Sequence, residues 1–328
     1  MNDLSEESSK EDIPYWETNL SKYSSGIIKL HYEIFDYSRH KILPSMNYKE
    51  RRNITIKKFE NILFSYYPTS TYIIYGSSIQ NLDTKDSDID ISIIFNLQYL
   101  ELSEISFLFN FKEILISEDF STNENTEIIY AKVPIIKTIC NETNFHIDIS
   151  LNQTDGLEFA KIINKFICHH PILKYMILFI KKFLSSKKFN NGNNGGMSSY
   201  SIIILVIHFY QIYISKNENK INLNFGNLFI MFLNYYVNEF DYKNNGISIK
   251  EGGKVFKIIS KFKWNYEINN DNKKISIESY IDEDCDIGRH IDKFNDIYNL
   301  FQKTLLIIRN LLEKNDKKIS FLKEIGLE

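Results

Sequence analysis

The sequence has few cysteines, no excess of positive charge and no long apolar run. Only 3 of its 328 residues are cysteine, and no two of them form a Cys-x-x-Cys pair. This excludes a familiar zinc site and a disulfide framework, and it fits a reducing intracellular compartment. The formal net charge is −3, which argues against a protein that coats nucleic acid through bulk electrostatics. Any contact with nucleic acid must then be local, weak or helped by a partner.

Signals for membrane insertion and secretion are also missing. The longest apolar stretch, residues 202–213, is interrupted by His208 and Gln211. It is too short to cross a bilayer, and it predicts a buried helix. The acidic, serine-rich residues 1–12 have no apolar core of the kind that a signal peptide needs. We therefore expect a protein that is neither secreted nor membrane-bound, in which residues 1–24 form a disordered or extended tail.

The chain does contain enough apolar residues for two folded domains. Hydrophobic residues make up 43% of it and aromatic residues 14%, which excludes global disorder. Strand-like alternation is frequent up to about residue 153, and the pattern after it is mostly helical. The predicted class is α+β, with a mixed-sheet domain at residues 48–153 and a mostly helical domain formed by residues 25–47 and 154–328. Strands are expected at residues 71–75, 87–95, 128–140 and 144–151, helices at 27–43, 48–66, 97–117, 157–168, 173–184, 199–215 and 291–312, and a strand-rich insertion at 246–281.

Three aspartates occupy the polar faces of two predicted strands. Side chains in a strand alternate between faces, so Asp88 and Asp90 lie opposite the apolar Ile89. Asp148 takes the same position in the strand at residues 144–151. Neighbouring carboxylates repel unless a cation lies between them, and Mg²⁺ prefers oxygen ligands. The pattern predicts a site for two metal ions, one to activate a hydroxyl and one to neutralise a triphosphate leaving group.

A Gly-Ser-Ser sequence, Gly76 to Ser78, follows the strand at residues 71–75. Glycine allows a tight turn, and backbone N–H groups at a helix start after it can hold phosphates. Taken alone, an Asp-x-Asp pair is usually a solvated strand face, and Gly-Ser-Ser is usually a turn. The combination in this order, with an apolar strand before each piece, favours a nucleotide site.

Longer stretches of the chain carry a family resemblance. They are YGSSIQNLDTKDSDIDISI, AKVPIIK, FHIDISL and GGMSSYSIIIL, with LHYEIFDY near the start and ISIESYIDEDCDIGR near the end. Together they resemble the noncanonical poly(A) polymerases of the TRAMP complex, also called DNA polymerase sigma, which are DNA-polymerase-β-like nucleotidyltransferases. The resemblance covers roughly residues 27–289. It implies a polymerase-β-like palm, a helical central domain, and template-independent addition of AMP from ATP to an RNA 3′ end with two Mg²⁺ or Mn²⁺ ions.

The resemblance also implies roles for individual residues. Asp88, Asp90 and Asp148 would be the catalytic metal ligands, and Asp148 would help to deprotonate the primer 3′-OH. Lys181, or Lys182 if the register differs by one, would hold the β- and γ-phosphates, unless it is simply a solvated lysine. Tyr200 would stack under the base, or else it packs in the core. The full set of implied nucleotide-binding residues is Gly76, Ser77, Ser78, Gly156, Lys181, Ser199, Tyr200, Glu278, Cys285, Asp286 and Arg289.

The late motif departs from the family pattern at two places. Ser279-Tyr280 stands where an Asp-Pro pair is usual, and Cys285 stands where Asn or His is usual. Relatives that prefer UTP carry histidine at the position of Cys285, so a small uncharged residue there favours ATP. A terminal uridylyltransferase and a catalytically inactive scaffold for RNA-decay factors remain alternatives, although the three carboxylates count against the scaffold. The late motif is of the type found in RNA-modifying enzymes, so an antibiotic-modifying nucleotidyltransferase is disfavoured.

The charge balance bears on partners. The chain has 39 basic residues against 42 acidic ones, and it contains no RNP motif, zinc knuckle or basic arm. We therefore expect weak RNA binding by the chain alone and distributive extension of an RNA 3′ end. The resemblance implies a zinc-knuckle RNA-binding protein and an RNA helicase as partners of a monomeric catalytic chain. It also implies RNA surveillance and decay in the nucleus, with the cytoplasm as the alternative.

Overall fold

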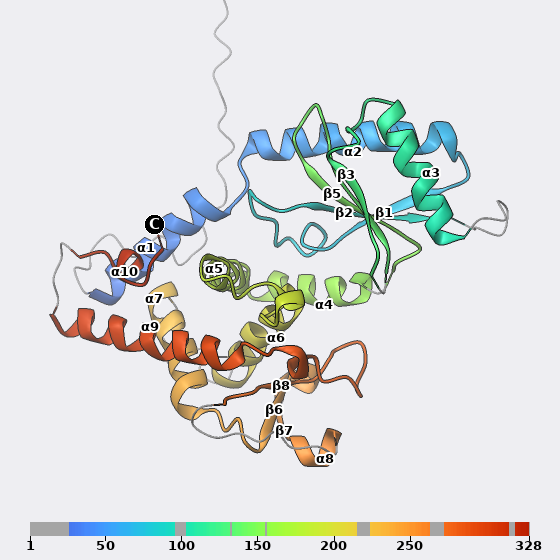
Figure 1. Ribbon diagram of the computed structural model, residues 1–328. Helices are drawn as coiled ribbons and strands as arrows, with labels where there is room; N and C mark the ends of the chain where they lie inside the picture. The colour runs from blue at the N-terminus through green and yellow to red at the C-terminus, as the bar shows by residue number, and fades with distance from the viewer. Residues whose placement is uncertain are drawn as a thin grey trace, which may run out of the picture. The chain divides into compact units, whose positions relative to one another are not determined.

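The computed structural model describes residues 26–95, 103–131, 133–154, 156–214, 224–262, 272–314 and 319–327. It divides into two compact units (Figure 1). The sheet unit comprises Ser38–Lys182 and Glu278–Asp286, and the helical unit comprises the remainder of the chain. The domain boundaries expected near residues 47 and 153 stay predictions, because a compact unit records packing and not independent folding. The expected tail at residues 1–24 lies outside the described residues.

A five-stranded mixed sheet forms the centre of the sheet unit, in the order β1-β2-β5-β4-β3. β2 runs parallel to β5, and the other neighbours pair antiparallel. The strands expected at residues 71–75, 87–95 and 144–151 are confirmed. The single strand expected at 128–140 is wrong: the segment forms two strands, because Pro134 has no backbone N–H to continue a ladder. The bounds are β1 (Thr71–Tyr75), β2 (Ile89–Ile94), β3 (Thr126–Ile129), β4 (Ile135–Ile139) and β5 (His146–Leu151).

The two faces of this sheet differ in polarity, as the alternation predicts. Ile89 and Ile91 of β2 and Ile147 of β5 are fully buried and belong to one apolar cluster. Two helices also contribute to this cluster, α2 (Met46–Tyr66) and α3 (Glu104–Ser117). They cover the apolar face, which leaves the opposite face to the aspartates. Residues 97–102 of the expected helix at 97–117 lie outside the described residues.

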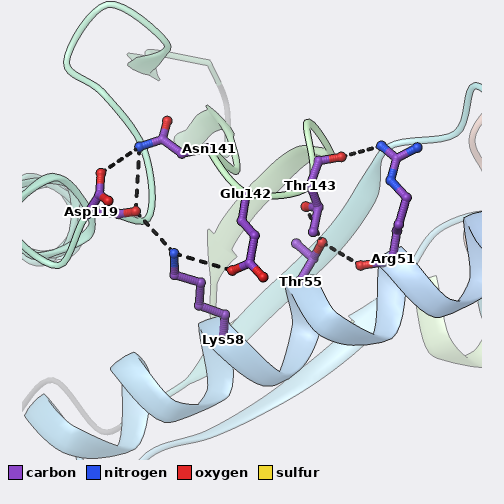
Figure 2. A network of polar contacts seen from close by, with 7 residues as sticks. All are labelled: Arg51, Thr55, Lys58, Asp119, Asn141, Glu142 and Thr143. Carbon is purple, nitrogen blue, oxygen red and sulfur yellow. Dashed lines mark hydrogen bonds and ion pairs between the residues drawn. The ribbon is translucent and has the colours of Figure 1, made fainter.

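A polar network fastens α2 to the turn between β4 and β5 (Figure 2). Arg51 donates a hydrogen bond to the carbonyl oxygen of Thr143, and the hydroxyls of Thr55 and Thr143 lie 2.6 Å apart. Lys58 Nζ lies 3.7 Å from Glu142 Oε2 and donates to the carbonyl oxygen of Asp119. The start of β5 is therefore held from the side of α2.

The rest of the sheet unit contains α4 (Gly156–His169) and most of α5 (Ile172–Ser186). The Asn164 amide on α4 donates to the carbonyl oxygen of Ile79 in the loop after β1. A π-helical turn, η1 (Ser38–Ile42), opens the unit. These helices confirm the helical periodicity expected at residues 157–168 and 173–184.

The helical unit is built around α6 (Ser199–Phe209), in which every residue from Ser201 onward is buried. The buried helix expected from residues 202–213 is confirmed, with its end forming the π-helical turn η4 (Tyr210–Ile214). A small sheet in the order β7-β6-β8 confirms the strand-rich insertion; residues 263–271 of that insertion lie outside the described residues. No helix in the described ranges is long and apolar enough to cross a membrane. The remaining elements are α1 (Gly26–Tyr37), η3 (Gly192–Asn194), α7 (Phe225–Asn234), η5 (Tyr235–Glu239), β6 (Asn245–Ser248), η6 (Lys250–Gly252), β7 (Lys254–Lys257), α8 (Ile258–Phe262), β8 (Ser276–Ile277), η7 (Ile287–His290), α9 (Phe294–Lys314) and α10 (Phe321–Glu324).

Candidate active site

The parallel pairing of β2 with β5 brings the predicted aspartates together. Asp90 and Asp148 are direct partners in this ladder, so their side chains leave the same face of the sheet from adjacent strands. Asp88 lies two residues before Asp90, directly ahead of β2, and its charge contributes to the raised pKa of Asp90. The sequence predicted the common face on each strand, and the strand order makes the two strands neighbours.

The pKa shifts show that the three carboxylates act on one another. Burial, followed by the charges of Asp148 and Asp88, raises the pKa of Asp90 to about 7. Burial and the charge of Asp148 also raise the pKa of Asp88, against the opposing effect of His146 and Lys137. Hard oxygen donors that repel one another in this way suit a divalent cation such as Mg²⁺.

The side chains are not already arranged as a metal site. In the part of the chain that the structure describes, no group of three acidic, histidine or cysteine side chains has metal-binding geometry. One reason is the position of Asp148, whose two carboxylate oxygens accept hydrogen bonds from Lys137 Nζ at 3.1 and 2.9 Å. Lys137 was not among the site residues predicted from the sequence. Lys137 could have been identified from the sequence, because it is a lysine on the polar face of a strand whose other residues are apolar or threonine.

The loop after β1 approaches Asp90 closely. Gly76 has a φ of +67°, and a Cβ at this position would lie 1.9 Å from Asp90 Oδ2, so both backbone conformation and space require glycine. The expected helix start after Gly76 is wrong: residues 76–81 form successive turns, because Asn81, with a φ of 55°, cannot continue a helix. The Ser78 hydroxyl is buried and has no hydrogen-bond partner among the described residues. Any backbone N–H groups that this loop offers to a phosphate therefore belong to turns and not to a helix.

Two neighbouring lysines at the end of α5 differ in their surroundings. Lys182 Nζ lies 3.0 Å from Asp86 Oδ2, with which it forms an ion pair. Burial lowers the pKa of Lys181, while the charges of Asp83 and Asp90 act in the opposite direction. The field of Asp90 thus reaches Lys181, which argues against a purely solvated side chain.

A pocket of about 110 Å³ lies beside Asp88. The Tyr48 hydroxyl donates to the carbonyl oxygen of Ser87 at its edge, and the Arg51 guanidinium lies 5.4 Å from the centre of the Phe145 ring. Of the pocket residues, Asp88 was predicted as a metal ligand, and His146 was interpreted as a neighbour of the metal ligands that does not itself bind the metal. The lining consists of Tyr48, Arg51, Lys85, Asp86, Ser87, Asp88, Asn144, Phe145 and His146.

The remaining predicted residues lie elsewhere. Ser199 and Tyr200 begin α6 of the helical unit, and Tyr200 is half-buried, so it is not a core residue. Arg289 is an exposed residue of η7 in the same unit. Gly156 begins α4, where a Cβ would meet no atom within 4 Å, so no steric reason requires glycine there. Ser77 accepts a hydrogen bond from the Leu82 N–H through its carbonyl oxygen.

The late motif forms a compact loop in the sheet unit, Glu278–Asp286. Glu278 and Asp286 are buried and pair as an isolated antiparallel bridge. The Ser279 N–H donates to the carbonyl oxygen of Cys285 at 3.0 Å, and Cys285 is half-buried. The loop therefore keeps Cys285 near the surface between two buried acids.

Comparison with known proteins agrees with this arrangement. Residues 32–167 match the family model of the central palm domain of mitochondrial-like poly(A) RNA polymerases, and residues 224–283 match that of Cid1 family poly A polymerases. A solved structure of the polymerase core of TRAMP, an RNA surveillance complex, superposes with a TM-score of 0.78 at 26% identity. It covers 95% of this chain and 96% of the solved one. The fold is that of DNA-polymerase-β-like nucleotidyltransferases.

Curated relatives narrow this class. Poly(A) RNA polymerase protein 1 of Saccharomyces cerevisiae is 32% identical over 222 residues, which are 67% of this chain and 34% of the yeast protein. The inactive poly(A) RNA polymerase protein Trf4-2 of Drosophila melanogaster is 28% identical over 80% of this chain and 64% of its own length. The chain belongs to the noncanonical poly(A) polymerases of the TRAMP type. It spans about a third of the length of the yeast relative.

Proposed function

We propose that the chain adds AMP from ATP to RNA 3′ ends without a template. The observation that carries this proposal is the register of Asp90 and Asp148 on adjacent parallel strands, with Asp88 directly before the first of these strands. Family membership supports it, and so does the close approach of the Gly76 loop to Asp90. An acidic face beside a tight glycine turn suits a reaction between a hydroxyl and a nucleoside triphosphate.

The three carboxylates fit Mg²⁺ or Mn²⁺, since their donor atoms are hard oxygens whose mutual repulsion a divalent cation relieves. Asp88, Asp90 and Asp148 would hold two such ions, which supply charge neutralisation at the hydroxyl and at the triphosphate. The 3′ oxygen of the RNA attacks the α-phosphorus of ATP, and the bond to pyrophosphate breaks. Asp148 accepts the hydroxyl proton. The contribution of the protein is mainly positioning and electrostatic stabilisation.

Other residues of the chain bind the nucleotide in this proposal. The backbone of Gly76 and Ser77, with Ser78 beside them, holds the triphosphate together with Lys181. Tyr200 stacks on the base, since an aromatic ring accepts any base by stacking. The residues that complete the nucleotide site are Gly156, Ser199, Glu278, Cys285, Asp286 and Arg289.

A uridylyltransferase remains a second candidate function, and it differs from the first in the choice of base. Cys285 is uncharged, small and half-buried, and a small residue leaves room for a purine. We therefore favour ATP. The inactive fly relative keeps the scaffold hypothesis in view, but Asp88, Asp90 and Asp148 are all present in this chain.

Assembly and location follow from the same proposal. The chain acts as a monomeric catalytic subunit in nuclear RNA surveillance, joined by an RNA-binding zinc-knuckle protein and an RNA helicase. The similarity to the polymerase core of TRAMP supports this view, as does the small excess of acidic over basic residues, because phosphate contacts need Lys or Arg.

A primer-extension assay tests the function. The purified chain is incubated with a short oligo(A), Mg²⁺ and each of the four nucleotides in turn. We expect extension mainly with ATP. Faster extension with UTP would identify a uridylyltransferase, and no extension by a folded protein with any nucleotide would identify a scaffold.

A further inference from the structure

One row of residues crosses all five strands of the main sheet. Tyr75 pairs with Asp90, Asp90 with Asp148, Asp148 with Lys137, and Lys137 with Glu127. Directly paired residues point to the same face, so these side chains lie side by side on the aspartate face. Two acids therefore stand next to a single base in the middle of the sheet.

Lys137 uses this position to bind Asp148. Its ammonium lies 2.9 Å from one carboxylate oxygen and 3.1 Å from the other. Glu127 is its direct partner on the opposite side, yet the ammonium is turned to Asp148. Among the described residues, Lys137 is the base that forms an ion pair with this group of three carboxylates.

The ion pair between Lys137 and Asp148 is partly buried, which makes the contact energetically significant. The Asp148 side chain is only 18% exposed, whereas that of Lys137 is 44% exposed. A largely buried carboxylate beside two others needs a countercharge, and the strand pairing supplies one that remains within reach of solvent. Lys137 can therefore give up the carboxylate at small cost when another cation arrives.

We propose that Lys137 is a positioning residue of the carboxylate site. It orients Asp148 and supplies the countercharge when no divalent cation is bound, so it competes with the cation for Asp148. The inference rests on the proposed function only in taking Asp88, Asp90 and Asp148 as the cation ligands.

The experiment measures Mn²⁺ binding by calorimetry and thermal unfolding with EDTA or with saturating Mn²⁺, without RNA or nucleotide. For Lys137→Met we expect Mn²⁺ to bind more tightly, on the order of tenfold, because one competing charge is removed. Its melting temperature should fall in EDTA and recover in Mn²⁺. Lys137→Arg, which keeps the charge, should bind Mn²⁺ nearly as the wild type does, and Lys137→Gln repeats the test if the Met variant does not fold.

Lys58→Met is the matched control, because Lys58 also pairs with a carboxylate, that of Glu142, but belongs to the network in Figure 2. It should leave Mn²⁺ affinity unchanged and shift the melting temperature equally with and without the cation. The same behaviour in Lys137→Met, or no Mn²⁺ binding by the wild type, would overturn the inference. A wild type that binds Mn²⁺ as expected but extends no RNA would refute the proposed function alone.

Discussion

The aspartates of β2 and β5 and the residues of the loop Glu278–Asp286 are positioned by different means. A continuous ladder of strand pairs fixes Asp90 and Asp148, and Asp88 directly precedes β2. The loop is held by one isolated bridge and a few turn hydrogen bonds. The parts of the proposed site therefore differ in how strictly the backbone determines them. Two of the proposed metal ligands lie on the ladder, and the residues proposed for base choice lie on the loop.

The largest effect on nucleotide addition is expected from substitution of the aspartates. Asp88→Ala combined with Asp90→Ala should lower nucleotide addition by more than about a hundredfold, because each metal role contributes several kcal/mol. The fold should persist, since the substitutions remove repelling charges. The measurement is primer extension beside a melting curve.

Glu127→Gln serves as the control for this double variant, because Glu127 lies in the same row of the sheet but two strands away from Asp148. It should keep nearly full activity. If the double variant retained more than about a tenth of wild-type activity, the two-metal assignment would be ruled out. Loss of the metal ions should lower activity far more than that.

Two glycine variants test how closely the loop after β1 approaches Asp90. Gly76→Ala should destabilise the protein by about 1–3 kcal/mol because of its left-handed backbone, and it should disturb Asp90, on which the new Cβ would impinge. Gly156→Ala meets no neighbouring atom and begins a helix, so its stability should be unchanged or slightly higher. Urea unfolding of both variants measures the difference. Equal destabilisation would contradict the close approach of Gly76 to Asp90.

The raised pKa of Asp90 predicts a dependence of stability on pH in metal-free protein. The folded-state pKa is about 7, against an ordinary value of 3.8, so between these values the folded state binds more protons than the unfolded state. The free energy of unfolding should therefore fall as pH rises from about 4 to about 7. Asp90→Asn, which stays neutral, should lack this part of the fall.

The measurement is urea unfolding in EDTA at several pH values, with the difference between wild type and Asp90→Asn taken at each. Saturating Mg²⁺ should abolish the difference in slope, because a bound cation stabilises the ionised carboxylate. Parallel pH curves for the two proteins in EDTA would contradict the burial and charge repulsion assigned to Asp90.

The smallest effect is expected from a substitution in the loop Glu278–Asp286. Cys285→His should shift the ratio of rates from ATP toward UTP by about tenfold or less, since a ring crowds the larger base and can hydrogen-bond the smaller one. Cys168→His is the control, because Cys168 is exposed on α4 and should not alter the ratio. An unchanged ratio in Cys285→His would mean that other residues, such as Ser279 or Asp284, select the base.

The sequence alone could predict the aspartate face because a strand repeats every two residues. Ile89 and Ile147 are fully buried, so the opposite positions of both strands had to be polar. The strand before Gly76 was predicted differently, from a run of β-branched and aromatic residues. The apolar run likewise predicted the buried helix α6, in which only the first two residues, Ser199 and Tyr200, are not buried.

What could not be predicted depends on which strands become neighbours. The contact of Lys137 with Asp148 requires β4 to lie beside β5, and no local pattern states that order. The break between β3 and β4 does have a local cause, since Pro134 lies within the run for which a single strand was predicted. The turns after Gly76 depend on the positive φ of Asn81, a conformation that many asparagines do not adopt.

The network that joins α2 to the turn between β4 and β5 limits the length of that turn. Asn144 adopts a φ of 55°, and the Cys140 N–H donates to the carbonyl oxygen of Phe145 across the turn. One residue added after Thr143 would shift β5 by one position and point Asp148 into the apolar core. The hydrogen bond from Arg51 to Thr143 opposes such a shift. Natural variation in this segment should therefore preserve the number of residues between Cys140 and Asp148.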